Sequence, residues 1–263
     1  MLTVDYDRLG LTAGELVLDL GCGAGRHTFE SLRRSTHTIS VDVDDVVLKD
    51  TSGMAAAMTQ EGEIDPDLTA ACVRADALQL PFVDRSFDTV IASEVLEHIR
   101  RDDRALGEIA RVLKPGGRVA VTVPRFWPEL LCWALSREYH ATAGGHLRIY
   151  RRSELVDKLR RAGFFVTDRH HAHAFHSPYW WAKCVLGERA PVRAYHRLLV
   201  WQITSGARIV GILERSLDPL LGKSLVVYAV KRRGKGGTGG RGATIGAPWR
   251  RGSPNKGAGD GRA

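Results

Sequence analysis

Short apolar runs alternate with helix-like segments along the first half of the chain. Between the runs, apolar residues recur at helical spacing over Gly25–Arg34, Val46–Thr59 and Arg104–Leu113, and a further helix is expected to start at Ser93–His98. The runs have the length and composition of buried parallel strands and are Leu16–Leu20, Thr38–Val43, Ala70–Arg74, Phe87–Ala92 and Arg118–Val123. Strands that alternate with helices predict a doubly wound α/β fold with a mainly parallel sheet.

The second half continues this pattern and then departs from it. An amphipathic segment at Arg151–Ala162 is followed by strand-like segments at Phe164–His171 and Ser224–Val230, which brings the predicted strands to seven. A helical insertion, 177–222, lies before the last strand and has a long helical pattern over Ala194–Leu217. We therefore expect one domain over 1–233, followed by a Gly/Arg-rich tail, 234–263, whose composition is typical of disorder.

The first strand ends in a glycine-rich loop. Gly21, Gly23 and Gly25 let the backbone turn sharply and let a ligand lie directly against the main chain. In open α/β sheets ligands bind at this carboxyl edge. Arg26 breaks the dinucleotide fingerprint, and Asp19 suits a cationic amino group better than a pyrophosphate, so the loop favours a positively charged nucleoside over NAD.

Two acidic residues follow the next strands. Asp42 ends the second strand at about the 20-residue offset at which an acid reaches a ribose hydroxyl. The alternative is helix capping, which we expect Asp44 or Asp45 to provide. Asp76 follows the third strand and predicts either a ligand contact or a turn-forming role.

Charge and cysteine content narrow the function classes. The formal net charge is +8, but the tail holds six Lys/Arg against one acid, which leaves only +3 on residues 1–233. That excess is too small to indicate a nucleic-acid surface.

Four cysteines are widely spaced and no leader pattern opens the chain, so we expect reduced thiols in a cytoplasmic protein. Charged residues interrupt the apolar insertion, which argues against a membrane span.

Several motifs together resemble those of class I S-adenosylmethionine-dependent methyltransferases, the broad group that includes the ubiquinone/menaquinone C-methyltransferases. The resemblance covers about residues 14–170 and the closing strand. It implies a Rossmann-like sheet whose seventh strand runs antiparallel between the fifth and sixth, with S-adenosylmethionine as cofactor. The matching segments are VLDLGCGAG (17–25), Asp42, Asp76-Ala77, LPFVDRSFDTVIASEVLEHI (80–99) and EIARVLKPGGRVAVTVP (108–124).

The resemblance also implies roles for individual residues. The glycines would pass under the methionine part of the cofactor, and Asp19 would hold its amino group directly or through water. Asp42 would accept from both ribose hydroxyls, Asp76 would accept from the adenine amino group, and the Ala77 amide would donate to a ring nitrogen. The implied cofactor-binding set is Asp19, Gly21, Cys22, Gly23, Gly25, Asp42, Asp76, Ala77 and Glu94.

Three residues are candidates for the methyl-transfer step. Glu94 and His98 are one helical turn apart and are predicted to share a face beside the methyl group. His98 has the intrinsic pKa of a general base at neutral pH, and His146 follows the fifth strand in a glycine-containing stretch. Each also fits a packing role. A catalytic side chain is not required, because methyl transfer needs chiefly alignment of the reactants and exclusion of water.

A histidine-rich stretch at 170–176 suggests a metal site at first sight. On a strand His171 and His173 share one face while His170 points away. No carboxylate or cysteine pair in the sequence completes a ligand set there. We therefore predict no metal.

The acceptor is the open question, because the cofactor motifs do not specify it. A small-molecule or lipid-linked acceptor fits, methylated on oxygen or carbon, such as a sugar, a polyketide or a quinone-like ring. The aromatic, basic-fringed insertion fits either a lid or dimer face, or a surface that meets a lipid-like acceptor at a membrane edge. RNA or protein methylation and a non-catalytic S-adenosylmethionine-binding module are the alternatives. No specific nucleic-acid partner is expected, and the oligomeric state is not predicted.

Overall fold

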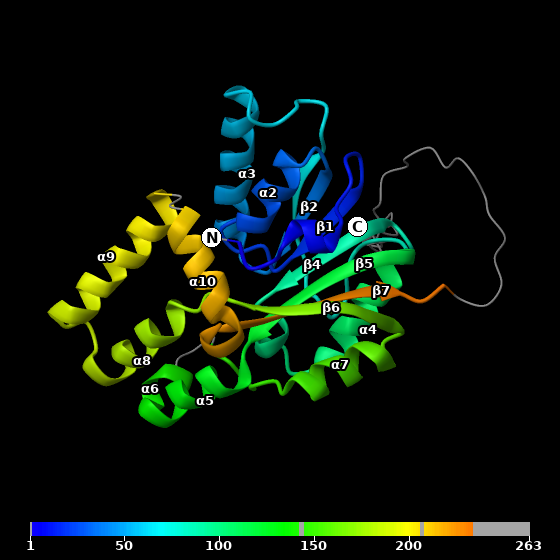
Figure 1. The fold of residues 1–263 in the computed structure, drawn as a ribbon. Coiled ribbons are helices and arrows are strands. Elements are labelled where there is room, and N and C mark those ends of the chain that lie inside the picture. The colour runs from blue at the N-terminus through cyan, green and yellow to red at the C-terminus, as the bar shows by residue number, and fades with distance from the viewer. Residues whose placement is uncertain (1, 142–144, 206–207, 234–263) are drawn as a thin grey trace, which may run out of the picture.

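A single seven-stranded sheet organises the computed structural model, which describes residues 2–141, 145–205 and 208–233; the tail, 234–263, lies outside them. The strand order is β3-β2-β1-β4-β5-β7-β6 (Figure 1). The strands are β1 (Leu16–Leu20), β2 (His37–Asp42), β3 (Ala70–Arg74), β4 (Phe87–Ser93), β5 (Leu113–Pro124), β6 (Phe164–Ala172) and β7 (Ser224–Lys231). The first five pair in parallel, and β7 is antiparallel to β5 and β6. The predicted fold class is confirmed.

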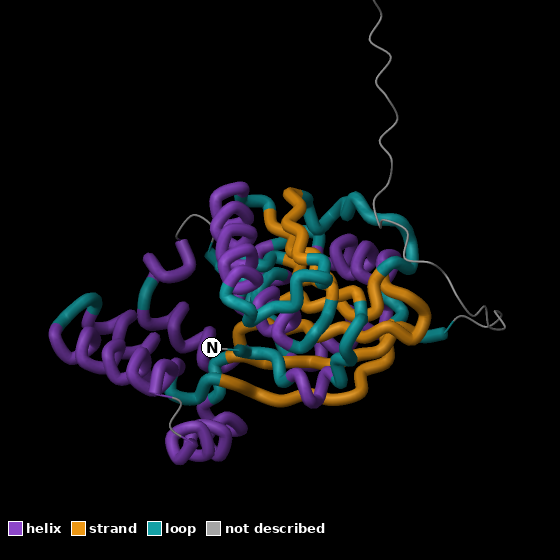
Figure 2. The backbone as a smooth tube through the Cα atoms, turned by 90° about the horizontal axis from the view of Figure 1, so that it is seen from above, coloured by secondary structure: helices purple, strands orange, loops and turns teal. Residues whose placement is uncertain are grey.

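Helices cover both faces of the sheet because its strands bury alternate side chains on opposite sides. Leu18 packs in a core with residues of α4 and α7, whereas its neighbour Val17 packs with α1. Figures 1 and 2 show α2 and α3 on one face, with α4 and α7 on the other. These helices are α1 (Tyr6–Leu9), α2 (Arg26–Arg33), α3 (Asp45–Gln60), α4 (Asp102–Val112) and α7 (Arg152–Arg161).

The functional edge of the sheet lies where the strand order reverses. β2 is hydrogen-bonded on one side of β1 and β4 on the other, so the connections after β1 and β4 leave in opposite directions. Such a switch point opens a crevice at the carboxyl ends of the two strands. The glycine loop follows β1 and Glu94 follows β4, which brings both sequence motifs to this crevice.

The structure corrects the expected helix start at Ser93–His98. β4 continues through Ser93, and Glu94 has a left-handed backbone with φ +57°. The Glu94 N–H donates to the carbonyl of Thr122 on β5, which holds this turn at the sheet edge instead of in a helix. Only a 3-10 turn, η1 (Leu96–His98), follows, and the helix begins at Asp102.

The insertion also differs from the sequence pattern. The helical pattern predicted over Ala194–Leu217 belongs to two helices, α9 (Ala190–Ser205) and α10 (Arg208–Leu221). With α8 (His176–Leu186), α5 (Phe126–Leu135) and α6 (Arg137–Ala141), they form a helical layer at one side of the sheet (Figure 1). Among the described residues, none of the helices combines the length and apolar character needed to span a bilayer.

Candidate functional site

The glycine loop after β1 is sterically tight. Gly21 has φ +68°, and a Cβ built there would lie 2.4 Å from Cγ2 of Val95. Gly23 also has a positive φ, and its N–H donates to Oδ2 of Asp42 at 3.0 Å. The Gly23 N–H therefore attaches the loop to the end of β2, and a side chain at position 21 would clash with Val95.

Asp42 is held in place by three backbone amides. Oδ2 accepts from Gly23, while Oδ1 accepts from Val43 and from Asp44. The N-cap of α3 is Asp44, whose side chain accepts from the Val46 N–H at 2.8 Å. The predicted division between a capping Asp44 and a non-capping Asp42 is thus seen in the structure.

A cavity of about 460 Å³ opens at this edge of the sheet. Asp76 lies in its wall and forms a turn through Oδ1, which accepts from the Leu78 N–H at 2.8 Å. Its Oδ2 accepts no hydrogen bond from the residues that the structure describes. The predicted residues that line the cavity are Gly21, Gly23, Asp42, Asp76, Ala77, Glu94 and His98. The structure therefore brings together most of the set that the sequence resemblance implied.

Asp19, Cys22 and Gly25 lie behind this wall and do not line the cavity. Asp19 is 1% exposed and accepts a hydrogen bond from Oγ1 of Thr28 at 2.7 Å. Burial raises the pKa of Asp19 to about 6, although the hydrogen bond from Thr28 opposes that rise. In this structure the Asp19 carboxyl is thus part of the support beneath the loop.

Glu94 and His98 reach the cavity wall by a route that differs from the predicted helix face. Glu94 accepts from Oγ1 of Thr122 at 3.0 Å, and His98 leaves the 3-10 turn η1. Nδ1 of His98 lies 3.3 Å from the carbonyl oxygen of Gly145. This contact ties His98 to the segment that carries His146.

His146 lies against His98 and is bound to a carboxylate from α5. The two imidazole centroids are 5.1 Å apart, and Nδ1 of His146 is 2.6 Å from Oε1 of Glu129. Glu129 is 1% exposed and also accepts from Trp133 and Tyr139. Although burial opposes ionisation, the hydrogen bond from His146 lowers the pKa of Glu129. The sequence analysis missed Glu129, whose only signal was a single acid in the apolar helix FWPELLCWAL.

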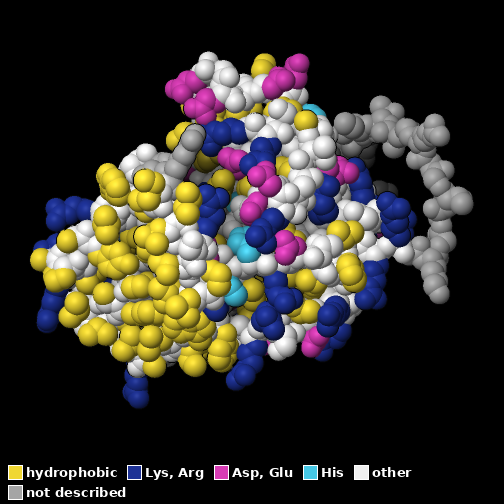
Figure 3. All heavy atoms as spheres, viewed as in Figure 1, with side chains coloured by type: hydrophobic (Ala, Val, Ile, Leu, Met, Phe, Trp, Pro, Cys, Tyr) yellow, Lys and Arg dark blue, Asp and Glu magenta, His cyan; other side chains and the backbone are white. Residues whose placement is uncertain are grey.

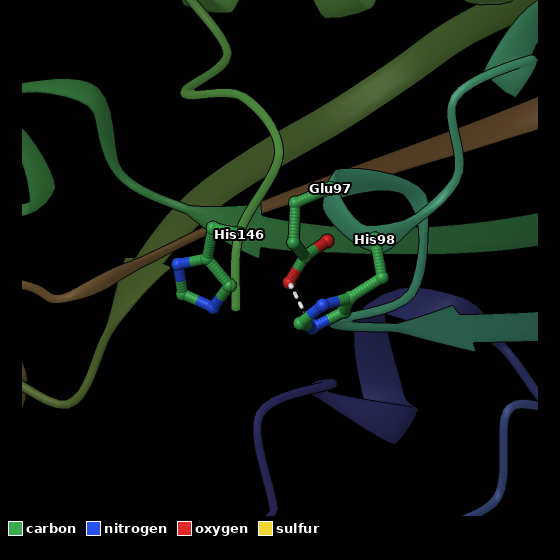
Figure 4. Close-up of side chains that lie close together, drawn as sticks. All are labelled: Glu97, His98 and His146. Carbon is green, nitrogen blue, oxygen red and sulfur yellow. Dashed lines mark ion pairs between the residues drawn. The ribbon is translucent and has the colours of Figure 1, made fainter. Parts of the chain in front are cut away.

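Glu97 is the second residue that the sequence analysis missed. It is fully buried, and neither carboxylate oxygen accepts a hydrogen bond from the described residues. Figure 4 shows its carboxylate between the rings of His98 and His146. Burial, and then the charge of Glu94, raise the pKa of Glu97 well above its usual range. In the sequence, only its position directly before the candidate residue His98 could have pointed to Glu97.

The histidine-rich stretch does acquire a nearby carboxylate, contrary to the sequence argument. β6 ends at Ala172 and His173 has φ +70°, so the expected strand face does not extend to His173. Ligand atoms of His173, His176 and Glu214 lie within 4.8 Å of one another. Nε2 of His173 is hydrogen-bonded to Thr3 at 3.0 Å. Another cavity, of about 590 Å³, adjoins this cluster and contains none of the predicted cofactor residues.

The family comparisons match the first five strands. Residues 18–121 match the family model described as a methyltransferase domain. Methyltransferase GfsG of Streptomyces halstedii is 36% identical over 117 residues, which cover 44% of this chain and 40% of that protein. Demethylmenaquinone methyltransferase of Thermobifida fusca is 36% identical over 109 residues, 41% of this chain and 43% of that protein. The matches thus span less than half the length of these curated relatives.

The likeness to solved structures extends over most of the chain. A putative methyltransferase from Bacillus halodurans has a TM-score of 0.59 at 19% identity, covering 86% of this chain and 96% of that one. The [4+2]-cyclase SpnF has a TM-score of 0.57 at 24% identity, covering 87% and 78%. Because one of these proteins is named as a cyclase, the likeness establishes the fold and not the reaction. Residues 18–121 thus match a methyltransferase domain family, and the chain has the Rossmann-like fold that solved S-adenosylmethionine-dependent methyltransferases share.

Proposed function

We propose that the protein transfers a methyl group from S-adenosylmethionine to an apolar or lipid-linked small-molecule acceptor. The observation that supports the cofactor assignment is the cavity at the β1/β4 switch point, whose wall contains the glycine loop and the carboxylates of Asp42, Asp76 and Glu94. The observation that supports the acceptor assignment is an exposed apolar face on α5, α8, α9 and α10.

The residues in the cavity wall fit the chemistry of the cofactor. Gly21 and Gly23 present backbone without side chains, so a ligand can lie against the loop. Asp42, fixed by three amides, can accept hydrogen bonds from a pair of ribose hydroxyls. Asp76 and Ala77 can bind the edge of a purine. Asp19 supports the loop from behind and does not line the cavity. It would therefore act on the amino group of the cofactor through the loop or through a water molecule.

The residues around the acceptor position would act mainly by orientation. When bound, S-adenosylmethionine supplies a methyl group that passes to a nucleophilic acceptor atom as the S–CH₃ bond breaks and its electron pair returns to sulfur, which leaves S-adenosylhomocysteine. Glu94 and His98 would border the reacting atoms from the wall of the cavity. His146, oriented by Glu129 and in contact with His98, would help to orient an acceptor hydroxyl.

The apolar face covers the outer side of α5, α8, α9 and α10. In Figure 3 hydrophobic side chains gather there, with Lys and Arg at the edges. Its exposed side chains are Trp127, Leu130, Leu131, Leu135, Val185, Leu198, Val200, Trp201, Ile203, Ile209, Ile212, Leu213 and Leu220. A contiguous apolar surface of this kind marks a binding or membrane-contact site, and its basic edge suits anionic lipid headgroups.

The position of this face favours a lipid-like acceptor. α5 presents Glu129 to His146 on its inner side and exposes Trp127, Leu130 and Leu131 on its outer side. An acceptor bound on the apolar face would therefore lie on the outer side of the helix that contacts His146, the neighbour of His98 in the cavity wall. The names of relatives, which include a demethylmenaquinone methyltransferase and an O-methyltransferase, support a small-molecule acceptor and leave open both carbon and oxygen.

Calorimetry with S-adenosylhomocysteine tests the cofactor half. We expect the wild-type protein to bind one equivalent and Asp42→Ala to bind about 100-fold more weakly, because two hydrogen bonds to a charged group are lost. Asp44→Ala, two residues further on and outside the cavity wall, is the matched control and should keep its affinity. A wild-type protein that binds neither S-adenosylhomocysteine nor S-adenosylmethionine would overturn the proposal.

Transfer of labelled methyl groups tests the acceptor half. Purified protein is incubated with methyl-labelled S-adenosylmethionine and either a membrane-lipid extract or a water-soluble metabolite extract. We expect label in organic-extractable products of the lipid reaction only. Label confined to water-soluble products, or to added RNA or protein, would contradict the proposed acceptor class while leaving the cofactor assignment intact.

A further inference from the structure

Glu97 is a buried carboxyl group with no hydrogen-bond partner among the described residues. It is 0% exposed and both oxygens are unpaired, apart from Nε2 of His98 at 4.0 Å, the outer limit of an ion pair. An unpartnered buried carboxylate is costly. Its orientation, between two imidazole rings, indicates a site built for a positively charged group (Figure 4).

The two histidines present the correct nitrogen to such a group. Nδ1 of His98 faces the Gly145 carbonyl and Nδ1 of His146 faces the Glu129 carboxylate; both partners can only accept, so each Nδ1 carries the proton. The lone pair of each imidazole is then on Nε2. A histidine that donates through one nitrogen and offers the other is the usual arrangement of a metal ligand.

The surroundings of Glu97 are rich in carboxylates. Glu94 and Glu129 both interact electrostatically with Glu97. Lys223 lies near these carboxylates, and its Nζ is 3.8 Å from Oε2 of Glu129. Backbone contacts also hold the cluster together, because the Leu147 N–H donates to the Glu97 carbonyl at 2.9 Å. A bound cation would offset the repulsion between these carboxylates.

We propose that Glu97, His98 and His146 bind a divalent transition-metal cation in the wall of the proposed acceptor site. Their ligand atoms lie within 4.8 Å of one another, and ligands about 2.1 Å from one cation are at most about 4.2 Å apart. The required shift is small and His98 is partly exposed. Two imidazoles and one carboxylate favour Zn²⁺, Mn²⁺, Fe²⁺ or Co²⁺ over Ca²⁺ or Mg²⁺. This proposal departs from the sequence analysis, which predicted no metal.

The metal would select an acceptor through its open coordination positions. Three protein ligands leave at least one position free, and His98 also lines the cavity, so a free position can face the acceptor. An acceptor with two neighbouring oxygen atoms, such as a vicinal diol or a catechol, would occupy two positions as a chelate. A metal-bound hydroxyl also loses its proton more readily. This acceptor assignment, unlike metal binding itself, rests on the proposed function.

The site is tested by metal binding to the full chain, without any activity measurement. Chelator-treated protein is titrated with Co²⁺ by absorption and with Mn²⁺ by calorimetry. We expect one equivalent to bind at this site, at least 30-fold more weakly in Glu97→Gln and in His146→Ala. His176→Ala removes a histidine of the other cluster and is the matched control, which should keep the wild-type affinity. Glu129→Gln, which only positions His146, should weaken binding about tenfold.

Each outcome decides the proposal. No binding by the wild-type protein, or loss in His176→Ala with retention in His146→Ala, would overturn it. The conservative Glu97→Gln keeps the size of a buried side chain that has no hydrogen-bond partner among the described residues, so the metal-free variant should melt no lower than wild type. Added Mn²⁺ should raise the melting temperature of wild type only. S-adenosylhomocysteine binding to the metal-free protein is measured in parallel, so a failure here is distinguishable from a failure of the proposed function.

The acceptor assignment has its own readout. Catechol should shift the absorption band of the Co²⁺-loaded protein at concentrations at which phenol, which has a single hydroxyl, leaves the band unchanged. A band that responds equally to both probes, or to neither, would overturn the chelating acceptor class and leave the metal site standing.

Discussion

The regions proposed to bind the cofactor and the acceptor are built by different means. Around the β1/β4 crevice, cavity residues stand at the ends of parallel strands, and backbone amides fix their side chains. Around α8–α10 the helices bury little, since α9 places only Val192 and Leu199 in the interior and their small cluster adds Tyr179. Large apolar side chains remain exposed instead. The first half is a fixed receptor, and the second has surface available for a partner.

The family match follows the same division. The methyltransferase domain model ends at residue 121, in β5 and before α5 begins. Everything that we assign to the acceptor, apart from Glu94, Glu97 and His98, lies beyond it. This division agrees with our proposal, in which the shared segment supplies the cofactor site and the segments after β5 select the acceptor.

The largest expected effect concerns the fixed half. Gly21→Ala should weaken S-adenosylhomocysteine binding about 100-fold, because its Cβ would lie 2.4 Å from Val95 and φ +68° is strained for alanine. Gly14→Ala is the matched control, with φ +79° but open space around its Cβ. It should lose about 1 kcal/mol of stability and no affinity. Calorimetry and thermal melts measure both, and equal affinities of the two variants would show that the loop is not a rigid receptor.

A smaller effect is expected on the apolar half. Trp201→Glu should reduce binding to vesicles of phosphatidylcholine and phosphatidylglycerol about tenfold, since the indole is 52% exposed and its apolar area would enter the interface. Met54→Glu changes a side chain of similar exposure, 53%, on α3. It should leave vesicle binding unchanged, and both variants should keep wild-type affinity for S-adenosylhomocysteine. Sedimentation with vesicles gives the comparison, and equal losses would disprove a localised lipid-binding face.

The same division explains what could be predicted from sequence. Asp42 and Asp76 could be placed in one cavity wall from the sequence because a site at strand ends depends on local order, in which a strand, a turn and an acid follow one another. The sheet and its antiparallel last strand followed from the alternation of apolar runs and from the family resemblance. Ala77, Gly21 and Gly23 line the same cavity, and their roles in binding stay predictions.

The acceptor wall was less predictable because its contacts join distant parts of the chain. Glu129 meets His146 across 17 positions, and His98 meets Gly145 across 47. Glu94 and His98 do line one cavity, but the helix face expected to unite them is wrong, because the chain turns at Glu94 toward β5. Glu214 reaches His176 only through the fold of α10. No local pattern encodes such pairs.

The smallest expected effect is a pH dependence of the fixed half. Burial raises the pKa of Asp19 to about 6, so between about pH 4 and pH 6 the folded protein keeps a proton that the unfolded chain releases. This group therefore stabilises the fold at low pH, and that contribution falls as pH rises through 6. The Asp19→Asn variant cannot ionise at this position and should melt several degrees above wild type at pH 8. The difference should shrink by pH 4.5.

The matched control is Asp50→Asn, because Asp50 is an exposed carboxylate on α3. This variant should follow wild type at every pH. If the difference in melting temperature between Asp19→Asn and wild type stayed constant from pH 4.5 to 8, the Asp19 carboxyl would ionise without a cost in stability. The inference that a buried carboxyl supports the loop from below would then be wrong.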